Sequence, residues 1–246
     1  GLMAEQRKVV IVQRRLTHYR IPLFASLRQA LAERDIQLEL LVGRGTVAEE
    51  SKRDAGELSW AQPLPTYYLA GGRLCWQSVK PYLADANMVI ITQENKLIHN
   101  HLLLLGSRHF KLAFWGHGAN LQSGNPHGFK ERFKQWTTNR VDWWFAYTQI
   151  SADLVTAAGF PVNRITVLNN AVDTAEMRQQ FLSVTAEETH ALRESLGFGT
   201  GPVGVFVGSL YSDKRLDFLF ATAEAIRREL PDFHLLIVGE GQERDK

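Results

Sequence analysis

One segment of the sequence places a glycine, a serine and two cations between an expected strand and an expected helix. These residues are Gly208, Ser209, Lys214 and Arg215, and the helical pattern after them covers residues 216–229. Backbone N–H groups at the start of a helix point outward and favour anions. A lysine ammonium group could also neutralise a diphosphate leaving group. The pattern predicts binding of a phosphate-bearing ligand.

A histidine lies between two glycines directly after another expected strand, Lys111–Trp115. Gly116 and Gly118 allow close approach of the backbone, and the imidazole of His117 can donate a hydrogen bond to a hydroxyl or a phosphate. Ligands of open α/β sheets bind beyond the carboxyl ends of the strands. We therefore expect His117 to be functional; the alternative is a structural histidine.

The loop after the first expected strand is rich in cationic and hydrogen-bonding side chains. It contains Arg14, Arg15, His18, Tyr19 and Arg20. Such a cluster could bind a phosphate or a sugar. The alternative is an ordinary solvated loop.

Several motifs with known chemistry are absent from the sequence. The first loop has no glycine, so neither G-x-G-x-x-G nor a phosphate-binding P-loop occurs, and neither G-x-S-x-G nor H-E-x-x-H is found. These absences argue against a dehydrogenase, a Walker-type NTPase and an α/β-hydrolase, and no metal site is expected. The single cysteine, Cys75, excludes an internal disulfide framework and fits a reducing compartment.

Apolar runs alternate with helical patterns along the chain, which is typical of repeated βα units. Runs rich in β-branched residues suit parallel strands that are buried on both faces. Seven strands are expected in the first part of the chain, at residues 8–12, 36–42, 66–70, 88–92, 111–115, 143–148 and 164–168. The pattern predicts an α/β fold with a Rossmann-like parallel sheet.

A second βα series begins near residue 186, with expected strands at 203–207 and 233–238. Two strands do not make a whole doubly wound domain, so we expect only the first part of a second Rossmann-like domain. The predicted boundaries are 1–172 for the first domain, 173–185 for an interdomain segment and 186–246 for the incomplete second domain.

The net charge of +2 is unevenly distributed along the chain. Residues 1–172 carry 20 Lys and Arg against 13 Asp and Glu, whereas residues 173–246 carry 8 against 13. A basic first part suggests an anionic partner, such as a phosphate-bearing ligand or a membrane surface, although chance scatter would give the same count. No nucleic-acid recognition module is visible.

Residues 128–140 predict a basic amphipathic helix, with Phe129, Phe133 and Trp136 along one face and four cations around them. Such a helix can lie on anionic lipid, or it can pack its aromatic face on the sheet. No apolar run approaches the ~20 residues of a membrane span, and the first residues lack an apolar signal-peptide core. We therefore expect a cytoplasmic protein with peripheral contact at the inner face of the membrane.

These segments together resemble the GT-B glycosyltransferases, in particular the retaining group 1 (family 4) type. Gly208 and Lys214 match the family's G-R-x(4)-K-G motif in spacing, with Ser209 in place of the arginine and Arg215 in place of the second glycine. The segment 167–173 (VLNNAVD) is similar to the family's P-N-G-V-D hinge segment.

Three more segments carry the resemblance. Ile237–Gly241, which contains Gly239 and Glu240, is similar to the family's V-G-x-G turn, and Trp115–Gly118 is similar to its histidine-bearing loop. His18–Phe24 is similar to loops of members that build polysaccharides.

The resemblance implies a hexosyltransferase that moves a sugar, with retention, from a nucleotide-diphosphate donor to a glycan or lipid-linked acceptor. Such activity would serve polysaccharide, lipopolysaccharide or glycolipid biosynthesis, without a metal or other cofactor. His117 would be catalytic. The expected donor-binding residues are Gly208, Ser209, Lys214, Arg215, Gly239 and Glu240, and the expected acceptor-binding residues are Arg14, His18, Tyr19 and Arg20. Because the family's E-x(7)-E segment would lie beyond Lys246, we expect this chain alone to be inactive in transfer.

Two other classes of protein remain open from the sequence. A sugar-nucleotide epimerase of GT-B-like fold would need acid–base groups, for which Glu94 and His117 are the candidates. A non-catalytic sugar-binding relative is favoured by Ser209 and Arg215, because both alter the donor motif.

Overall fold

The computed structural model describes residues 5–118 and 128–246. The chain divides into two compact units. The first comprises Gly1–Glu50 and Asp54–Val172, and the second comprises Asp173–Lys246 with Ser51–Arg53. Each unit is described by itself below.

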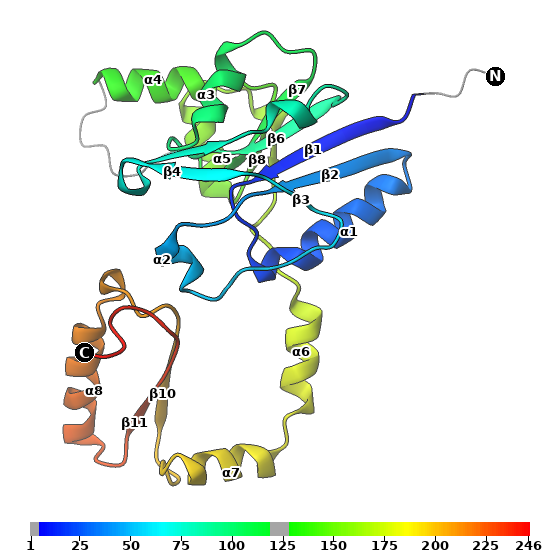
Figure 1. The fold of residues 1–246 in the computed structure, drawn as a ribbon. Helices are drawn as coiled ribbons and strands as arrows, with labels where there is room; N and C mark the ends of the chain where they lie inside the picture. Colours follow the sequence, from blue (N-terminus) through cyan, green and yellow to red (C-terminus); the bar gives the residue numbers. More distant parts are fainter. Residues whose placement is uncertain (1–4, 119–127) are drawn as a thin grey trace. The chain divides into compact units, whose positions relative to one another are not determined.

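The first unit is built on a seven-stranded sheet in which every strand pair is parallel (Figure 1). Its strand order is β3-β2-β1-β6-β7-β8-β9. The strands are β1 (Arg7–Gln13), β2 (Ile36–Val42), β3 (Gln62–Pro63), β6 (Met88–Thr92), β7 (Lys111–Gly116), β8 (Trp143–Ala146) and β9 (Ile165–Val167). The direction of chain progress reverses between β1 and β6, so the loops after these strands diverge there.

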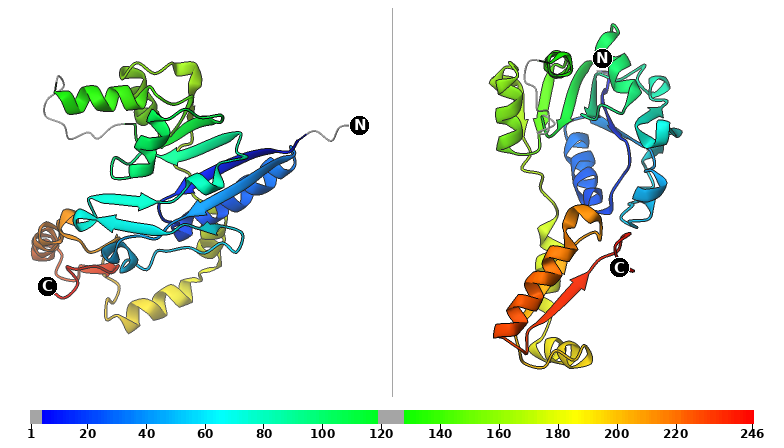
Figure 2. Two further views of the ribbon diagram at one scale, coloured as in Figure 1. Left: turned by 45° about the horizontal axis from the view of Figure 1, so that its top comes forward. Right: turned by 90° about the vertical axis from the view of Figure 1, so that its left-hand side faces the viewer.

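Alternate residues of the central strands enter separate hydrophobic clusters, because successive side chains of a strand point to opposite faces. Val10 and Val12 of β1 belong to one cluster and Ile11 belongs to the other. The second cluster includes Phe24, which is fully buried on α1 (Ile21–Ala32). Helix α1 has Pro22 in its first turn, where the fixed φ of proline suits a helix start, and it packs against β2 (Figure 2).

The remaining helices of the first unit connect the strands. They are α2 (Val47–Glu50), α3 (Ile98–Leu105), α4 (Phe129–Thr138) and α5 (Gln149–Ala157), with the short 3-10 turns η1 (His18–Arg20), η2 (Ala70–Gly72), η3 (Lys80–Tyr82) and η4 (Val162–Arg164). Helix α5 was not predicted from the sequence. Its start is fixed by Thr148, whose side chain accepts a hydrogen bond from the backbone N–H of Ser151.

The segment expected as a third parallel strand, 66–70, is instead half of an antiparallel hairpin. Here β4 (Thr66–Leu69) pairs with β5 (Leu74–Gln77), outside the main sheet. The turn between them contains Gly71 and Gly72, both at positive φ, which glycine adopts without steric cost. The seventh place in the main sheet belongs to the two-residue strand β3.

The second unit contains a parallel pair of strands, β10 (Val203–Val207) and β11 (His234–Val238), with α8 (Leu216–Glu229) packed against β11. A 3-10 turn, η5 (Ser212–Lys214), leads into α8. Two further helices precede the pair, α6 (Thr174–Ser183) and α7 (Ala186–Ser195).

The strands of the second unit carry exposed apolar side chains. Val205 and Val207 of β10 are 60% and 74% exposed, and Val238 of β11 is 47% exposed. The segment 173–185, expected as a link between domains, is mostly the helix α6. Asp173 caps this helix by accepting a hydrogen bond from the N–H of Ala175 at 3.0 Å.

Candidate functional site

His117 follows β7 at the carboxyl edge of the sheet, and both glycines beside it are needed for packing. A Cβ on Gly118 would lie 2.6 Å from the carbonyl oxygen of Ser151, and one on Gly116 would lie 2.9 Å from the Cβ of Gln93. The backbone N–H of Gly118 also donates to Oε1 of Gln93 at 3.1 Å. The glycines therefore let neighbouring parts of the protein, rather than a ligand, approach the backbone closely. These contacts fix the backbone on either side of His117, whose side chain is exposed.

His117 belongs to a cluster of aromatic rings around one buried guanidinium group. Its ring centroid lies 4.3 Å from that of Tyr147, which follows β8. The guanidinium carbon of Arg20 lies 4.9 Å from the ring centroid of Trp115 and 5.4 Å from that of Tyr147. The ring of Tyr19, 43% exposed, lies 5.5 Å from the same carbon. The structure thus brings three predicted site residues, Tyr19, Arg20 and His117, into one cluster at the ends of β7 and β8.

The charge of Arg20 is not balanced by a carboxylate among the described residues. Its residue surface is 9% exposed, and it donates a hydrogen bond to Oδ1 of Asn170 at 2.9 Å. Aromatic ring faces and one neutral oxygen do not cancel the positive charge of a buried cation. Such a cation therefore attracts an anionic ligand more strongly than a cation that is paired with a carboxylate.

Arg14 and Arg15, by contrast, are tied into ion pairs. The guanidinium of Arg14 donates to both carboxylate oxygens of Glu49 at 2.7 Å and to Oε2 of Glu94 at 3.1 Å. Arg15 donates to both carboxylate oxygens of Asp54 at 2.7 Å. These acidic groups neutralise the arginines that the sequence offered for phosphate binding, and the role of Arg14 in acceptor binding stays a prediction.

The ion pair between Arg14 and Glu49 shifts the pKa of both groups. Burial raises the pKa of Glu49, but hydrogen bonds from Arg14 and the backbone of Thr46 outweigh burial and lower this pKa to about 2. Burial lowers the pKa of Arg14, but Glu49 and Glu94 raise it by more, so its pKa lies above the ordinary value. Both groups are therefore charged over the whole physiological range.

Glu94 and Tyr147 complete the set of groups that could exchange protons with a ligand. Glu94 follows β6, and its Oε2 lies 3.6 Å from Nζ of Lys96 in addition to its contact with Arg14. Burial raises the pKa of Tyr147; Arg20 opposes this rise, whereas Tyr19 and Glu94 add to it. Tyr147 is consequently a neutral phenol that can donate a hydrogen bond.

Tyr147 and Asn170 were not singled out from the sequence. The available signal was positional, because Tyr147 lies near the carboxyl end of the expected strand 143–148, directly after β8, and Asn170 lies just beyond β9. The remaining predicted member of the first loop, His18, is exposed and contacts the carbonyl oxygen of Asp54 through Nδ1 at 3.2 Å.

In the second unit, the loops after β10 and β11 pack tightly on each other. A Cβ on Gly239 would lie 1.8 Å from the carbonyl oxygen of Gly208, so position 239 has no room for a side chain. The carbonyl oxygen of Glu240 accepts a hydrogen bond from the N–H of Leu210 at 2.9 Å. The Glu240 carboxylate pairs with Arg244 at 2.6 Å, so it faces the turn that follows it.

The two cations of the donor-like motif differ in conformation and contact. Lys214 ends η5, is exposed, and makes no ion pair within the described part of the chain. Arg215 has a left-handed backbone (φ 52°) at the N-cap of α8, and its guanidinium lies over the ring of Phe218 at 5.7 Å. Ser209 is half-buried. The ligand roles predicted for these residues stay predictions.

None of the described groups of His, Cys, Asp and Glu side chains has three or more members arranged to hold a metal ion. Cys75 is a free, buried thiol, and burial raises its pKa.

Across residues 5–118 and 128–246, no helix is both long enough and apolar enough to cross a membrane.

The fold and the carboxyl-edge site define a GT-B-like α/β protein, which confirms the predicted fold class. No family model matches the sequence, and no curated protein matches it at a significant level.

Similar solved structures include enzymes and complexes of UDP-sugars. The UDP-GlcNAc 2-epimerase from Neisseria meningitidis, bound to UDP-GlcNAc, has a TM-score of 0.55 at 13% identity, covering 94% of this chain and 64% of that one. Anabaena HepE in complex with UDP-glucose has a TM-score of 0.58 at 15% identity, with coverage of 95% and 60%. The UDP-GlcNAc 2-epimerase from Methanocaldococcus jannaschii, with UDP-GlcNAc and UDP, has a TM-score of 0.50 at 12% identity, with coverage of 97% and 67%. The chain thus spans less than two thirds of the length of the Neisseria and Anabaena proteins.

The similarity to UDP-GlcNAc 2-epimerases overturns the predicted glycosyltransferase function, and it does not support the family 4 and hexosyltransferase forms of that prediction. The motifs that suggested transfer are strand–loop–helix junctions that suit any phosphate-bearing ligand. Such junctions therefore reflect the shared fold rather than a particular reaction.

Proposed function

We propose that this protein is a sugar-nucleotide epimerase that acts on a UDP-sugar. The observation that carries the proposal is the cluster in which His117 contacts Tyr147 over the unbalanced charge of Arg20, with Glu94 near enough to raise the pKa of Tyr147. The UDP-sugar complexes of the similar structures support the ligand class.

Epimerisation at C2 of a UDP-sugar requires a proton to leave one face of the carbon and to return on the other. Because C2 has no neighbouring carbonyl group to acidify it, the C2–H electron pair would form a C1–C2 double bond as the bond from C1 to the diphosphate oxygen breaks. Return of the diphosphate to C1 and of a proton to the opposite face of C2 would then give the epimer. We propose Glu94 and His117 as the two proton-exchanging groups, with Tyr147 orienting the imidazole ring.

The diphosphate formed in that step needs positive charge near it. In the first unit, Arg20 is the candidate, because its guanidinium is buried without a carboxylate partner among the described residues. For the second unit taken by itself, we propose Lys214 as a phosphate-binding residue, since it is exposed and makes no ion pair within the described residues at the turn before α8. No metal or cofactor is required by this chemistry.

The direct test is to incubate the chain with UDP-GlcNAc and to follow formation of its C2 epimer by proton NMR. We expect conversion by the wild-type chain, conversion reduced at least ~100-fold for Glu94→Gln and for His117→Gln, and unchanged conversion for His109→Gln. His109 is an exposed histidine of the same unit that does not belong to the cluster. No epimer from any UDP-sugar tested, or equal rates for all variants, would refute the proposal.

We also propose peripheral contact with an anionic membrane through α4. Its aromatic residues Phe129, Phe133 and Trp136 are 84%, 41% and 41% exposed, so they do not form part of the core. Flotation with anionic vesicles should recover the wild-type chain and lose it after Phe133→Ser with Trp136→Ser. Equal recovery with neutral vesicles would argue against this contact.

A further inference from the structure

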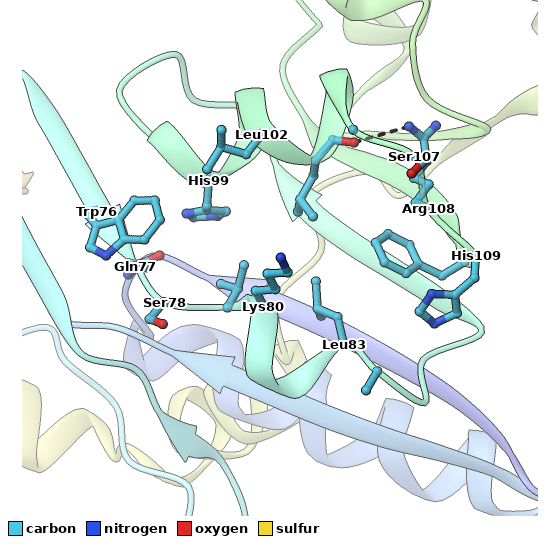
Figure 3. Close-up of a pocket in the computed structure, with 15 residues that line it drawn as sticks. Trp76, Gln77, Ser78, Lys80, Leu83, His99, Leu102, Ser107, Arg108 and His109 are labelled. Atoms are coloured by element: carbon cyan, nitrogen blue, oxygen red, sulfur yellow. Dashed lines mark hydrogen bonds between the residues drawn. The ribbon is translucent and has the colours of Figure 1, made fainter.

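A cavity of about 520 Å³ lies in the first unit, away from the His117 cluster (Figure 3). Its walls come from α3, from η3, from the end of β5 and from residues 106–110 before β7. None of the cluster residues lines it. The size is typical of pockets for small molecules.

One end of this cavity carries buried polar atoms that have no partner among the described residues. His99 is 2% exposed, and neither of its ring nitrogens makes a hydrogen bond. Gln77 is fully buried, and its Oε1 is also unpaired, whereas its Nε2 donates to the carbonyl oxygen of Arg14 at 2.9 Å. Figure 3 shows the His99 ring and the Gln77 side chain at the same end of the cavity. Buried polar groups are nearly always satisfied, so three unpaired atoms in one place indicate a polar ligand group.

The ring of His99 is neutral in this environment. Burial and, to a smaller extent, the neighbouring His101 together lower its pKa to about 4. A neutral imidazole offers one donor and one acceptor, while Gln77 Oε1 offers an acceptor. A hydroxyl group matches this set, because it can donate to one atom and accept from another.

A cation and an apolar wall complete the cavity. Lys80 is exposed at the mouth and has no acidic partner among the described residues, and Figure 3 shows its amine between His99 and Leu83. Arg108, also at the wall, is already committed to the carbonyl oxygens of Leu103 and Arg140. Beyond Lys80, the wall is formed by apolar side chains, among them Leu83, Leu103 and Phe110.

We propose that this cavity binds a small 2-hydroxycarboxylate with an apolar tail. The hydroxyl group bonds to His99 and Gln77, the adjacent carboxylate pairs with Lys80, and the tail packs against Leu83 and Phe110. The site is independent of the proposed epimerase chemistry, since none of its residues belongs to that cluster.

Calorimetric titration of the chain with 3-phenyllactate tests the proposal. We expect binding of 3-phenyllactate, at least tenfold weaker binding of 3-phenylpropanoate, which lacks the hydroxyl, and of 3-phenylpropane-1,2-diol, which lacks the carboxylate. Lys80→Gln should weaken 3-phenyllactate binding at least tenfold, whereas Arg7→Gln, at an exposed cation that does not line the cavity, should leave it unchanged. Absence of binding would mean that the cavity holds water only, and equal affinity for all three probes would mean that neither the hydroxyl nor the carboxylate is recognised; either result would overturn the proposal.

His99→Leu separates a ligand-binding role from a structural one. If His99 serves a ligand, the leucine variant should melt at a higher temperature without ligand, because two unpaired buried nitrogens are removed. 3-Phenyllactate should then raise the melting temperature of the wild type but not that of His99→Leu. His99→Gln, which keeps a donor and an acceptor, should retain the ligand-induced rise. A lower melting temperature for His99→Leu together with an unchanged ligand response would contradict the assignment.

Discussion

The ion pair between Arg14 and Glu49 should make the first unit sensitive to acid, and Glu49→Gln should remove that sensitivity. Glu49 accepts hydrogen bonds from two nitrogens of Arg14 at 2.7 Å and from the N–H of Thr46 at 3.1 Å. These bonds favour the charged carboxylate, which is why its pKa falls to about 2 in the folded chain.

The magnitude follows from the difference between the folded and unfolded pKa values. A fall from 4.5 to about 2 corresponds to ~3 kcal/mol at about 1.4 kcal/mol per pKa unit. Because the Glu49 side chain is 20% exposed and solvent screens part of the attraction, we expect roughly 1–2 kcal/mol. Since the folded pKa is depressed, this contribution is complete above pH 4.5 and disappears as the pH falls toward 2.

Urea unfolding followed by tryptophan fluorescence measures this contribution in the first unit alone. All six tryptophans of the chain lie there, at positions 60, 76, 115, 136, 143 and 144. The free energy of unfolding of the wild type should exceed that of Glu49→Gln by roughly 1–2 kcal/mol at pH 6. The two free energies should converge near pH 2. Glu33→Gln, at an exposed carboxylate, serves as the matched control and should follow the wild type.

Two results would refute this reasoning. One is a wild type and a Glu49→Gln variant that lose stability in parallel between pH 6 and pH 2. The other is a Glu33→Gln variant that converges with the wild type in the same way, because the effect would then be general to carboxylates.

Three further changes test other parts of the structure. Gly239→Ala places a Cβ 1.8 Å from the carbonyl oxygen of Gly208 and should destabilise the second unit by about 2–4 kcal/mol; a change below about 0.5 kcal/mol in circular-dichroism unfolding would contradict the packing. Arg20→Met removes the cation over Trp115 and should lower the stability of the first unit by about 1–2 kcal/mol, which tryptophan fluorescence would detect; an unchanged midpoint would show that the stacking contributes nothing. His117→Gln should reduce epimer formation without changing the melting temperature, since the side chain is exposed; a lowered melting temperature would indicate a structural histidine.

The sequence predicts the buried parallel strands well because their signal is local. Val9–Val12 and Val89–Ile91 are runs of β-branched residues, and both lie in the centre of the sheet. The segment Thr66–Leu69 (TYYL) also contains residues that favour strands, but its partner strand is set by the Gly71-Gly72 turn, so its place outside the sheet was missed.

The candidate site could be predicted by position but not by charge balance. His117 was recognisable because it follows a strand, whereas the difference between Arg14 and Arg20 depends on contacts that are distant in sequence. Glu49 and Glu94, which neutralise Arg14, lie 35 and 80 residues away from it. Only the folded chain shows that, of the arginines in the loop after β1, Arg20 is the one without a carboxylate partner among the described residues.

The most direct measurement of the central claim is the fate of the C2 hydrogen when UDP-GlcNAc is incubated with the chain in D₂O. If Glu94 and His117 exchange protons with the sugar, mass spectrometry should find one deuterium at C2 of the epimer, and Glu94→Gln should abolish its incorporation. Epimer that retains the original hydrogen, or deuterium that enters equally with Glu94→Gln, would contradict the account.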